Sequence, residues 1–157
     1  MAAQTNYNYG TPKGVPGGKV DLSLDEVITR INEAEDGALK FGMAAAVGTA
    51  PGSNVNVPGA DTTAEKIEGV VLYHPNTEQD RNGRVIVRKN ASLGIMRRGH
   101  VWARTAAGVA PVYGEKAYVC LSGDDTGTFT NVADGALDIG ATFGNASDDG
   151  IAVVILR

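Results

Sequence analysis

Few side chains in this sequence could carry out catalysis. The chain holds two histidines, His74 and His100, and one cysteine, Cys120. Two separated histidines cannot supply a three-histidine zinc site, and Cys120 lies in an apolar segment where a thiol is expected to be buried and unreactive. The sequence also lacks a Gly-x-Ser-x-Gly motif, a phosphate-binding P-loop and a His-Glu-x-x-His motif. We therefore expect no enzymatic activity and no cofactor.

Two pairs of adjacent carboxylates, Asp124-Asp125 and Asp148-Asp149, offer the oxygen ligands that calcium prefers. Neither pair fits the twelve-residue EF-hand pattern. Aspartate is also frequent in turns, because it tolerates left-handed backbone and bonds its own main chain. We expect two turns here, and no metal site.

The basic side chains are concentrated in one segment. Residues 81–104 carry a net charge of +7, whereas residues 1–80 carry −6 and residues 105–157 carry −5, which together give the overall −4. The members of this basic band are Arg81, Arg84, Arg88, Lys89, Arg97, Arg98 and Arg104. The overall acidity therefore conceals one strongly basic segment.

Three explanations of the basic band remain open. Its arginines could pair with acids of neighbouring strands, they could contact an acidic protein surface, since the planar guanidinium is favoured at interfaces, or they could bind nucleic acid. The last is the weakest, because Trp102 is the one aromatic residue nearby and the acidic chain as a whole repels a polyanion. No direct nucleic-acid contact is expected.

The composition predicts the framework that must position these groups. A chain of 157 residues with 21 glycines, 43% hydrophobic and 20% charged residues suits one folded domain rich in strands and turns. No apolar run approaches the ~20 residues of a membrane span, and the first residues lack the apolar core of a signal peptide. Residues 1–20 follow neither strand nor helix periodicity and contain several glycines and prolines. We predict an extended N-terminal arm over 1–20, with a frayed terminus as the alternative, and a single β-rich domain over 21–157.

Short strands separated by turns predict a small β-barrel or a jelly-roll-like β-sandwich. For residues 24–34 a short helix and a strand both remain open, because the apolar spacing suits a helix while Val27-Ile28-Thr29 is β-branched. Asn82-Gly83 predicts a type I′ hairpin turn. The C-terminal run Ile151–Leu156 is apolar throughout, so it belongs inside the fold or in a subunit interface. The predicted strands are residues 41–47, 67–73, 84–88, 101–104, 111–113, 116–121, 137–143 and 151–156.

Several glycine-rich motifs in this order resemble the head decoration, or structural cement, proteins of tailed bacteriophages. The motifs are Thr11-Pro12-Lys13-Gly14-Val15-Pro16-Gly17, Phe41-Gly42, Gly69-Val70-Val71, Gly99-His100-Val101-Trp102-Ala103, Pro111-Val112-Tyr113-Gly114 and Gly150 through Arg157. The resemblance covers most of residues 10–157. It implies a β-rich, trimeric, non-enzymatic protein on the outside of the head, which holds neighbouring major capsid proteins together against the pressure of packaged DNA.

On this basis we expect a virion protein that is made in the host cytoplasm and binds the major capsid protein and itself, as a homotrimer, with no membrane partner. The candidate capsid contacts are Tyr7, Tyr9, Pro12, Pro16, Arg84, Arg88, Arg97 and Arg98. The candidate trimer contacts are Trp102, Ile151, Val153 and Ile155. The alternative function is a carbohydrate- or receptor-binding β module on a virion surface, with Tyr73, Trp102 and Tyr113 as a platform for sugars.

Overall fold

A computed structural model describes residues 13–75, 79–146 and 148–157. These residues form strands with one single-turn 3₁₀ helix, η1 (Ala64–Lys66). The strands are β1 (Glu26–Asn32), β2 (Ala44–Val47), β3 (Asn54–Asn56), β4 (Ile67–Val71), β5 (Ser92–Arg104), β6 (Lys116–Cys120), β7 (Phe129–Thr130), β8 (Ala136–Phe143) and β9 (Ile151–Leu156). The prediction of a mainly β fold is confirmed.

Five strands close into a small barrel. They follow the order β1-β3-β2-β4-β5, and β5 pairs back with β1 to complete the ring. The β1–β3 pair is parallel and the other pairs in the ring are antiparallel. Closure leaves no unpaired edge around this ring. Of the two predicted architectures, the barrel is therefore correct.

Residues 26–32 form a strand, which settles the choice left open for residues 24–34. β1 runs antiparallel to β5, with Val27 opposite Met96 and Ile28 opposite Ile95. The β-branched residues at 27–29 lose little side-chain freedom in an extended backbone, and the long β5 provides a partner for them. Tertiary pairing thus overrides the helical apolar spacing.

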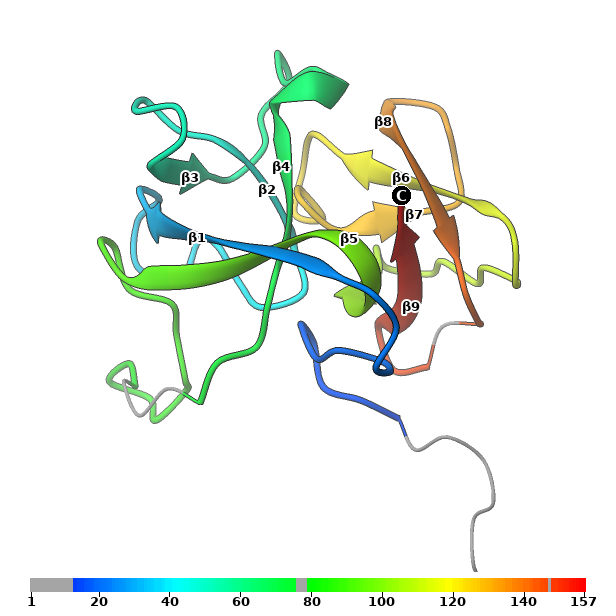
Figure 1. Ribbon diagram of the computed structural model, residues 1–157, viewed down its shortest axis with the longest axis horizontal. Helices are drawn as coiled ribbons and strands as arrows, with labels where there is room; N and C mark the ends of the chain where they lie inside the picture. Colours follow the sequence, from blue (N-terminus) through cyan, green and yellow to red (C-terminus); the bar gives the residue numbers. More distant parts are fainter. Residues whose placement is uncertain (1–12, 76–78, 147) are drawn as a thin grey trace, which may run out of the picture.

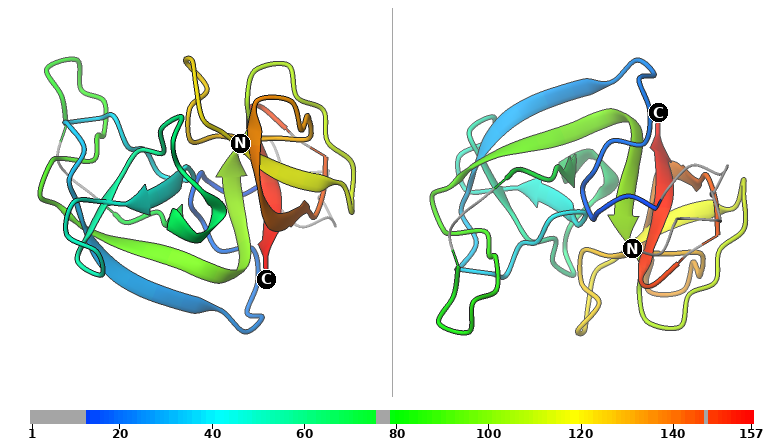
Figure 2. Two further views of the ribbon diagram at one scale, coloured as in Figure 1. Left: turned by 90° about the horizontal axis from the view of Figure 1, so that it is seen from above. Right: turned by 90° about the horizontal axis from the view of Figure 1, so that it is seen from below.

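β5 belongs to two sheets. Residues 92–98 pair with β1, and residues 99–104 pair with β9 in the order β5-β9-β8-β6-β7. Gly99 stands at the change of partner with φ +125°, and a Cβ there would lie 2.8 Å from the Cβ of Asp25. Figures 1 and 2 show β5 running between the barrel strands on one side and β6–β9 on the other. The second sheet also returns to the residue that follows β5, through an isolated bridge between Thr105 and Phe129.

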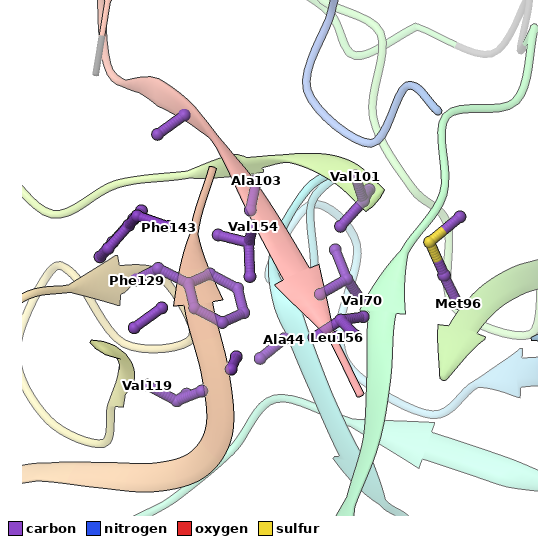
Figure 3. Packing of buried hydrophobic residues seen from close by; sticks show 13 residues of the cluster. Ala44, Val70, Met96, Val101, Ala103, Val119, Phe129, Phe143, Val154 and Leu156 are labelled. Carbon is purple, nitrogen blue, oxygen red and sulfur yellow. The ribbon is translucent and has the colours of Figure 1, made fainter. Parts of the chain in front are cut away.

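Two apolar clusters fill the interior. One lies within the barrel and includes Leu39, Val55 and Ile95. The other joins the barrel to the second sheet, and Figure 3 shows Phe129, Phe143 and their neighbours packed together there. Burying a side chain of this size contributes about 1.5–3 kcal/mol, so the shared cluster fixes the two sheets as one body.

The C-terminal run forms β9 as predicted, and all its side chains except that of Ile155 are buried. The turn at Asn82-Gly83 differs from the prediction: Gly83 has φ +75° but Asn82 does not have positive φ, so the turn is not type I′. The carboxylate of Asp80 instead accepts bonds from the backbone N–H groups of Asn82 and Arg84, at 2.8 and 2.9 Å. Because the turn is built on this side chain, residues 84–88 do not form the predicted strand and Val85 pairs only through a bridge to Gln79.

Other boundaries also differ from the prediction. Residues 111–113 are turn and coil rather than the predicted strand, and β3 lies between the predicted strands 41–47 and 67–73, where no strand was predicted. Nothing in the described part of the chain is a helix long and apolar enough to cross a membrane.

Candidate docking surfaces

The segment 13–20 lies against the body of the protein. Gly17 N–H donates to the carbonyl of Trp102 at 2.6 Å, and Trp102 N–H donates to the carbonyl of Gly18 at 2.9 Å. Val20 N–H donates to the carbonyl of His100. These bonds place the segment beside β5, on the edge that β9 leaves free.

The predicted capsid contacts of the arm therefore fall in two groups. Pro16 is half-buried against the body, and the Cβ position of Gly42 lies 3.2 Å from its side chain. Tyr7, Tyr9 and Pro12 lie outside the described residues. The described part of the predicted arm is thus docked, and its root is held where Lys13 pairs with Asp149 at 3.2 Å.

Three of the four predicted trimer contacts are already covered within one chain. Trp102 is 6% exposed and packs with Ile151 and Val153, which are also buried. A Cβ on Gly14 would lie 2.1 Å from the Trp102 ring, so only glycine allows this close approach. Ile155 is the one member of the set that remains half-exposed.

Beside Ile155 the surface carries large apolar side chains that none of the described residues covers. Leu22 is fully exposed, Leu24 is 99% exposed and Tyr113 is 79% exposed. A hollow between them is lined by Leu24, Tyr113 and Ile155. We call Leu22, Leu24, Tyr113 and Ile155 the apolar patch. Large exposed apolar side chains that gather in one region are typical of an interaction site.

Polar bonds fix the loop that presents the two leucines. The carboxylate of Asp21 accepts bonds from the N–H and hydroxyl of Ser23 and lies 2.9 Å from Nδ1 of His100. These bonds, from Ser23 first and then His100, lower the pKa of Asp21 to about 2. Lys19 holds Asp25 on the other side at 2.6 Å. The loop is therefore tied at both ends while its leucines point to solvent.

Three of the seven members of the basic band form ion pairs inside the chain. Arg97 donates to the buried carboxylate of Glu68 at 2.6 Å, and Arg30 lies 3.4 Å from the same oxygen. We call Arg30, Glu68 and Arg97 the Glu68 cluster. Two further members of the band also find acids: Arg88 bonds Asp36 and Lys89 bonds Glu35.

Three of the four remaining members of the band stand around a groove of about 820 Å³ between the loops 36–41 and 79–88. Lys40, Arg81, Arg84 and Arg104 line it, and we call it the basic groove. Within the described residues, none of these four side chains forms an ion pair. Arg98, also exposed and without such a pair in the same residues, lies instead beside the apolar patch.

A family model described as "Structural cement protein (E217 gp24/Pam3 gp6)" matches residues 3–157, nearly the whole chain. The chain belongs to this phage family. It is a structural component of a phage virion that associates with capsid proteins and stabilises the capsid.

A solved structure also resembles the cement protein. A chain of "The capsid of Myoviridae Phage XM1" superposes with a TM-score of 0.75, covering 100% of this chain and 98% of that chain at 15% identity. At that identity the likeness shows a shared fold alone. No curated protein matches the cement protein in sequence.

The residues considered for catalysis are dispersed in the cement protein. No group of three or more histidine, cysteine, aspartate or glutamate side chains suited to a metal ion occurs in the described residues. Cys120, predicted to be buried, is only half-buried, and desolvation raises the pKa of its thiol. The proposed platform for sugars is not assembled, because Trp102 is buried and the Tyr73 ring packs edge-on against Phe41.

Sequence reasoning missed the apolar patch. Leu24 belongs to a series of apolar residues whose spacing suits the buried face of a helix. Residues 26–32 form a strand instead, and Leu24, which precedes this strand, is exposed to solvent. Tyr113 was considered only for sugar binding. A pair of leucines flanked by aspartates, Asp21 to Asp25, is the one local signal that this segment is a loop.

Proposed function

We propose that the cement protein binds the outer surface of the phage head as a homotrimer, contacts the major capsid protein, and acts without catalysing a reaction. The observation that carries this proposal is the apolar patch, in which two leucines stand almost completely in water on a loop tied by Asp21 and Asp25. A rigid body loses little conformational entropy when it docks. Many copies around a shell add avidity to each contact.

The apolar patch supports a subunit interface in place of the predicted Trp102, Ile151 and Val153 contacts. Ile155 belongs to both sets and joins the patch to the β9 edge. Burying the patch against a second copy would remove several apolar side chains from water, each worth about 1.5–3 kcal/mol. In a cyclic trimer, the same surface on each of the three subunits can form the contacts that close the ring of subunits.

The oligomer is tested by light scattering coupled to size-exclusion chromatography. The double variant Leu22→Ser/Leu24→Ser should elute as a monomer, whereas the wild type elutes as a trimer. Val132→Ser is the matched control, because Val132 is also an exposed apolar residue but lies outside the patch. A trimeric double variant, or a monomeric wild type, would contradict the proposed interface.

The arm is tested by deleting only residues 2–12. A longer deletion would also remove Gly14 through Gly18, which cover Trp102 and bond β5, so a loss of binding could then reflect an altered body. The deletion variant should occupy undecorated heads less fully than the wild type, with unchanged circular dichroism. Equal occupancy would refute the arm's role in capsid binding.

The position on the head is tested by electron microscopy of particles with and without the cement protein. We expect extra density on the outer face of the shell at positions of threefold symmetry. Density on the inner face would contradict the proposed location.

A further inference from the structure

We propose that the basic groove binds a short acidic peptide segment of the major capsid protein, with Arg104 receiving one of its carboxylates. This inference rests on the proposed function, because it assumes that the protein docks on the head. It adds the chemistry of one contact and the residues that make it.

The groove carries positive charge on four side chains that form no ion pair among the described residues: Lys40, Arg81, Arg84 and Arg104. Two acids, Asp36 and Asp80, also line it. The carboxylate of Asp36 already accepts bonds from Lys89 N–H and Arg88, both at 2.9 Å. Asp80 accepts two backbone bonds within its own turn. Neither carboxylate makes an ion pair with Lys40, Arg81, Arg84 or Arg104 in the described residues.

Arg104 is the groove residue that is best placed to bind a carboxylate of a partner. Its side chain is partly buried, and its Nε–H donates to the carbonyl of Phe41 at 2.8 Å. That bond fixes the guanidinium and leaves its two terminal NH₂ groups directed away from Nε. Desolvation lowers the pKa of Arg104, because its charged side chain is partly removed from water. A carboxylate placed on the terminal NH₂ groups would restore the lost interaction through a paired, charge-assisted bond.

The surroundings favour a short peptide over a nucleic acid. Lys40 and Arg104 also line a second groove on their other side. Five acids line that second groove: Glu33, Glu35, Asp124, Asp125 and Asp149. A continuous polyanion that extended past Arg104 would meet these carboxylates, whereas a segment with one or two acidic side chains can end at the ridge between the grooves. Electrostatic complementarity of this local kind fixes the register of a complex.

The test measures binding to undecorated heads of the same phage as a function of salt. The variant Arg81→Glu/Arg84→Glu reverses two exposed charges of the groove, and Lys66→Glu makes the same type of change on the exposed turn of η1, which lines neither the groove nor the hollow of the apolar patch. We expect the groove variant to bind at least 10-fold more weakly than the wild type at 50 mM NaCl, with a shallower dependence on salt, because exposed charges are screened. Lys66→Glu should stay within twofold. Equal binding by the groove variant, or an equal loss with Lys66→Glu, would overturn the inference.

A second measurement uses the isolated full-length protein with two defined probes. An acetylated hexaglutamate peptide should shift the NMR signal of the Arg104 Nε–H group in the wild type and not in the groove variant. A shift caused by oligothymidylate but not by the peptide would overturn the choice of an acidic peptide. If the wild type fails to bind heads but the peptide still binds at Arg104, head docking is refuted while the chemistry of the groove stands. If heads bind and neither variant nor peptide has an effect, only the groove inference fails.

Discussion

The Glu68 cluster and the basic groove use arginine in opposite ways. In the cluster, Arg97 and Arg30 converge on one carboxylate that is only 7% exposed, so their charges are neutralised inside the fold. In the groove, Arg81 and Arg84 stand in solvent and Arg104 is partly buried, and none of the three forms an ion pair with a carboxylate of the described residues, although Asp36 and Asp80 line the same groove. Charge pairing within the fold stabilises the monomer, whereas charge left open is available to a partner. The net charge of a segment does not distinguish these two uses.

The largest effect is expected when the cluster loses its acid. Glu68→Gln leaves Arg30 and Arg97 facing a neutral amide, and the partly buried Arg30 then has no compensating charge. We expect the free energy of unfolding to fall by about 2–4 kcal/mol, measured by urea denaturation. Glu65→Gln, on the exposed turn of η1, is the matched control and should change stability by less than about 0.5 kcal/mol. A loss no larger than that of the control would show that the cluster is not a stabilising pair.

A smaller effect is expected when the cluster loses one arginine. Arg30→Met leaves Glu68 bonded to Arg97 at 2.6 Å and removes the Arg30 Nε–H, a buried donor with no partner among the described residues. The change in the free energy of unfolding should stay below about 1 kcal/mol, because removing a buried donor without a partner also removes its desolvation cost and so offsets the lost ion pair. A loss as large as that of Glu68→Gln would mean that both arginines are required.

An acid-induced effect is expected at the edge of the groove. Bonds from Lys89 N–H and Arg88 lower the pKa of Asp36 below its ordinary value of 3.8. A carboxyl whose pKa is lower in the folded state stabilises the fold above its unfolded pKa and loses this contribution as pH falls through the folded value. The stability of the wild type should therefore decline as pH falls below about 4, and Asp36→Asn should show a weaker decline over that range. Identical acid profiles from chemical denaturation would contradict this assignment.

The smallest effect on stability is expected inside the groove. Arg84→Gln removes an exposed side chain whose charge is not paired in the described residues, and only its backbone N–H bonds Asp80. The free energy of unfolding should change by less than about 0.5 kcal/mol, in contrast to the Glu68 variants. A larger loss would show that the groove arginines contribute to the fold and would remove the contrast between the two regions.

The strands that depend on a local pattern of apolar residues could be predicted from the sequence alone. The apolar run of β9 and the strands near residues 67–71, 116–120 and 136–143 lie close to their predicted bounds, because an apolar or alternating pattern is itself the cause of those strands. The full length of β5 could not be predicted. The strand that pairs with β5 changes from β1 to β9 at Gly99. The alternation of buried and exposed residues is therefore broken in the middle of β5.

The candidate surfaces depend on contacts between distant residues and were harder to predict. Glu68 and Arg97 are 29 positions apart, and Arg88 and Asp36 are 52 positions apart, so the sequence could not show which arginines are paired. Trp102 was expected at a subunit contact because it is large and apolar, but the segment around Gly14 covers it. Only the folded chain shows which apolar and basic side chains remain uncovered.

β5 also determines how the protein carries mechanical load. If the barrel and the second sheet are bound to different capsid subunits, expansion of the shell pulls residues 92–98 and residues 99–104 in opposite directions along one covalent strand. The hydrogen bonds to β1 on one side and β9 on the other are then loaded in shear, so that many bonds share the force instead of opening one after another. A single continuous strand can thus resist tension between neighbours without relying on an interface between domains.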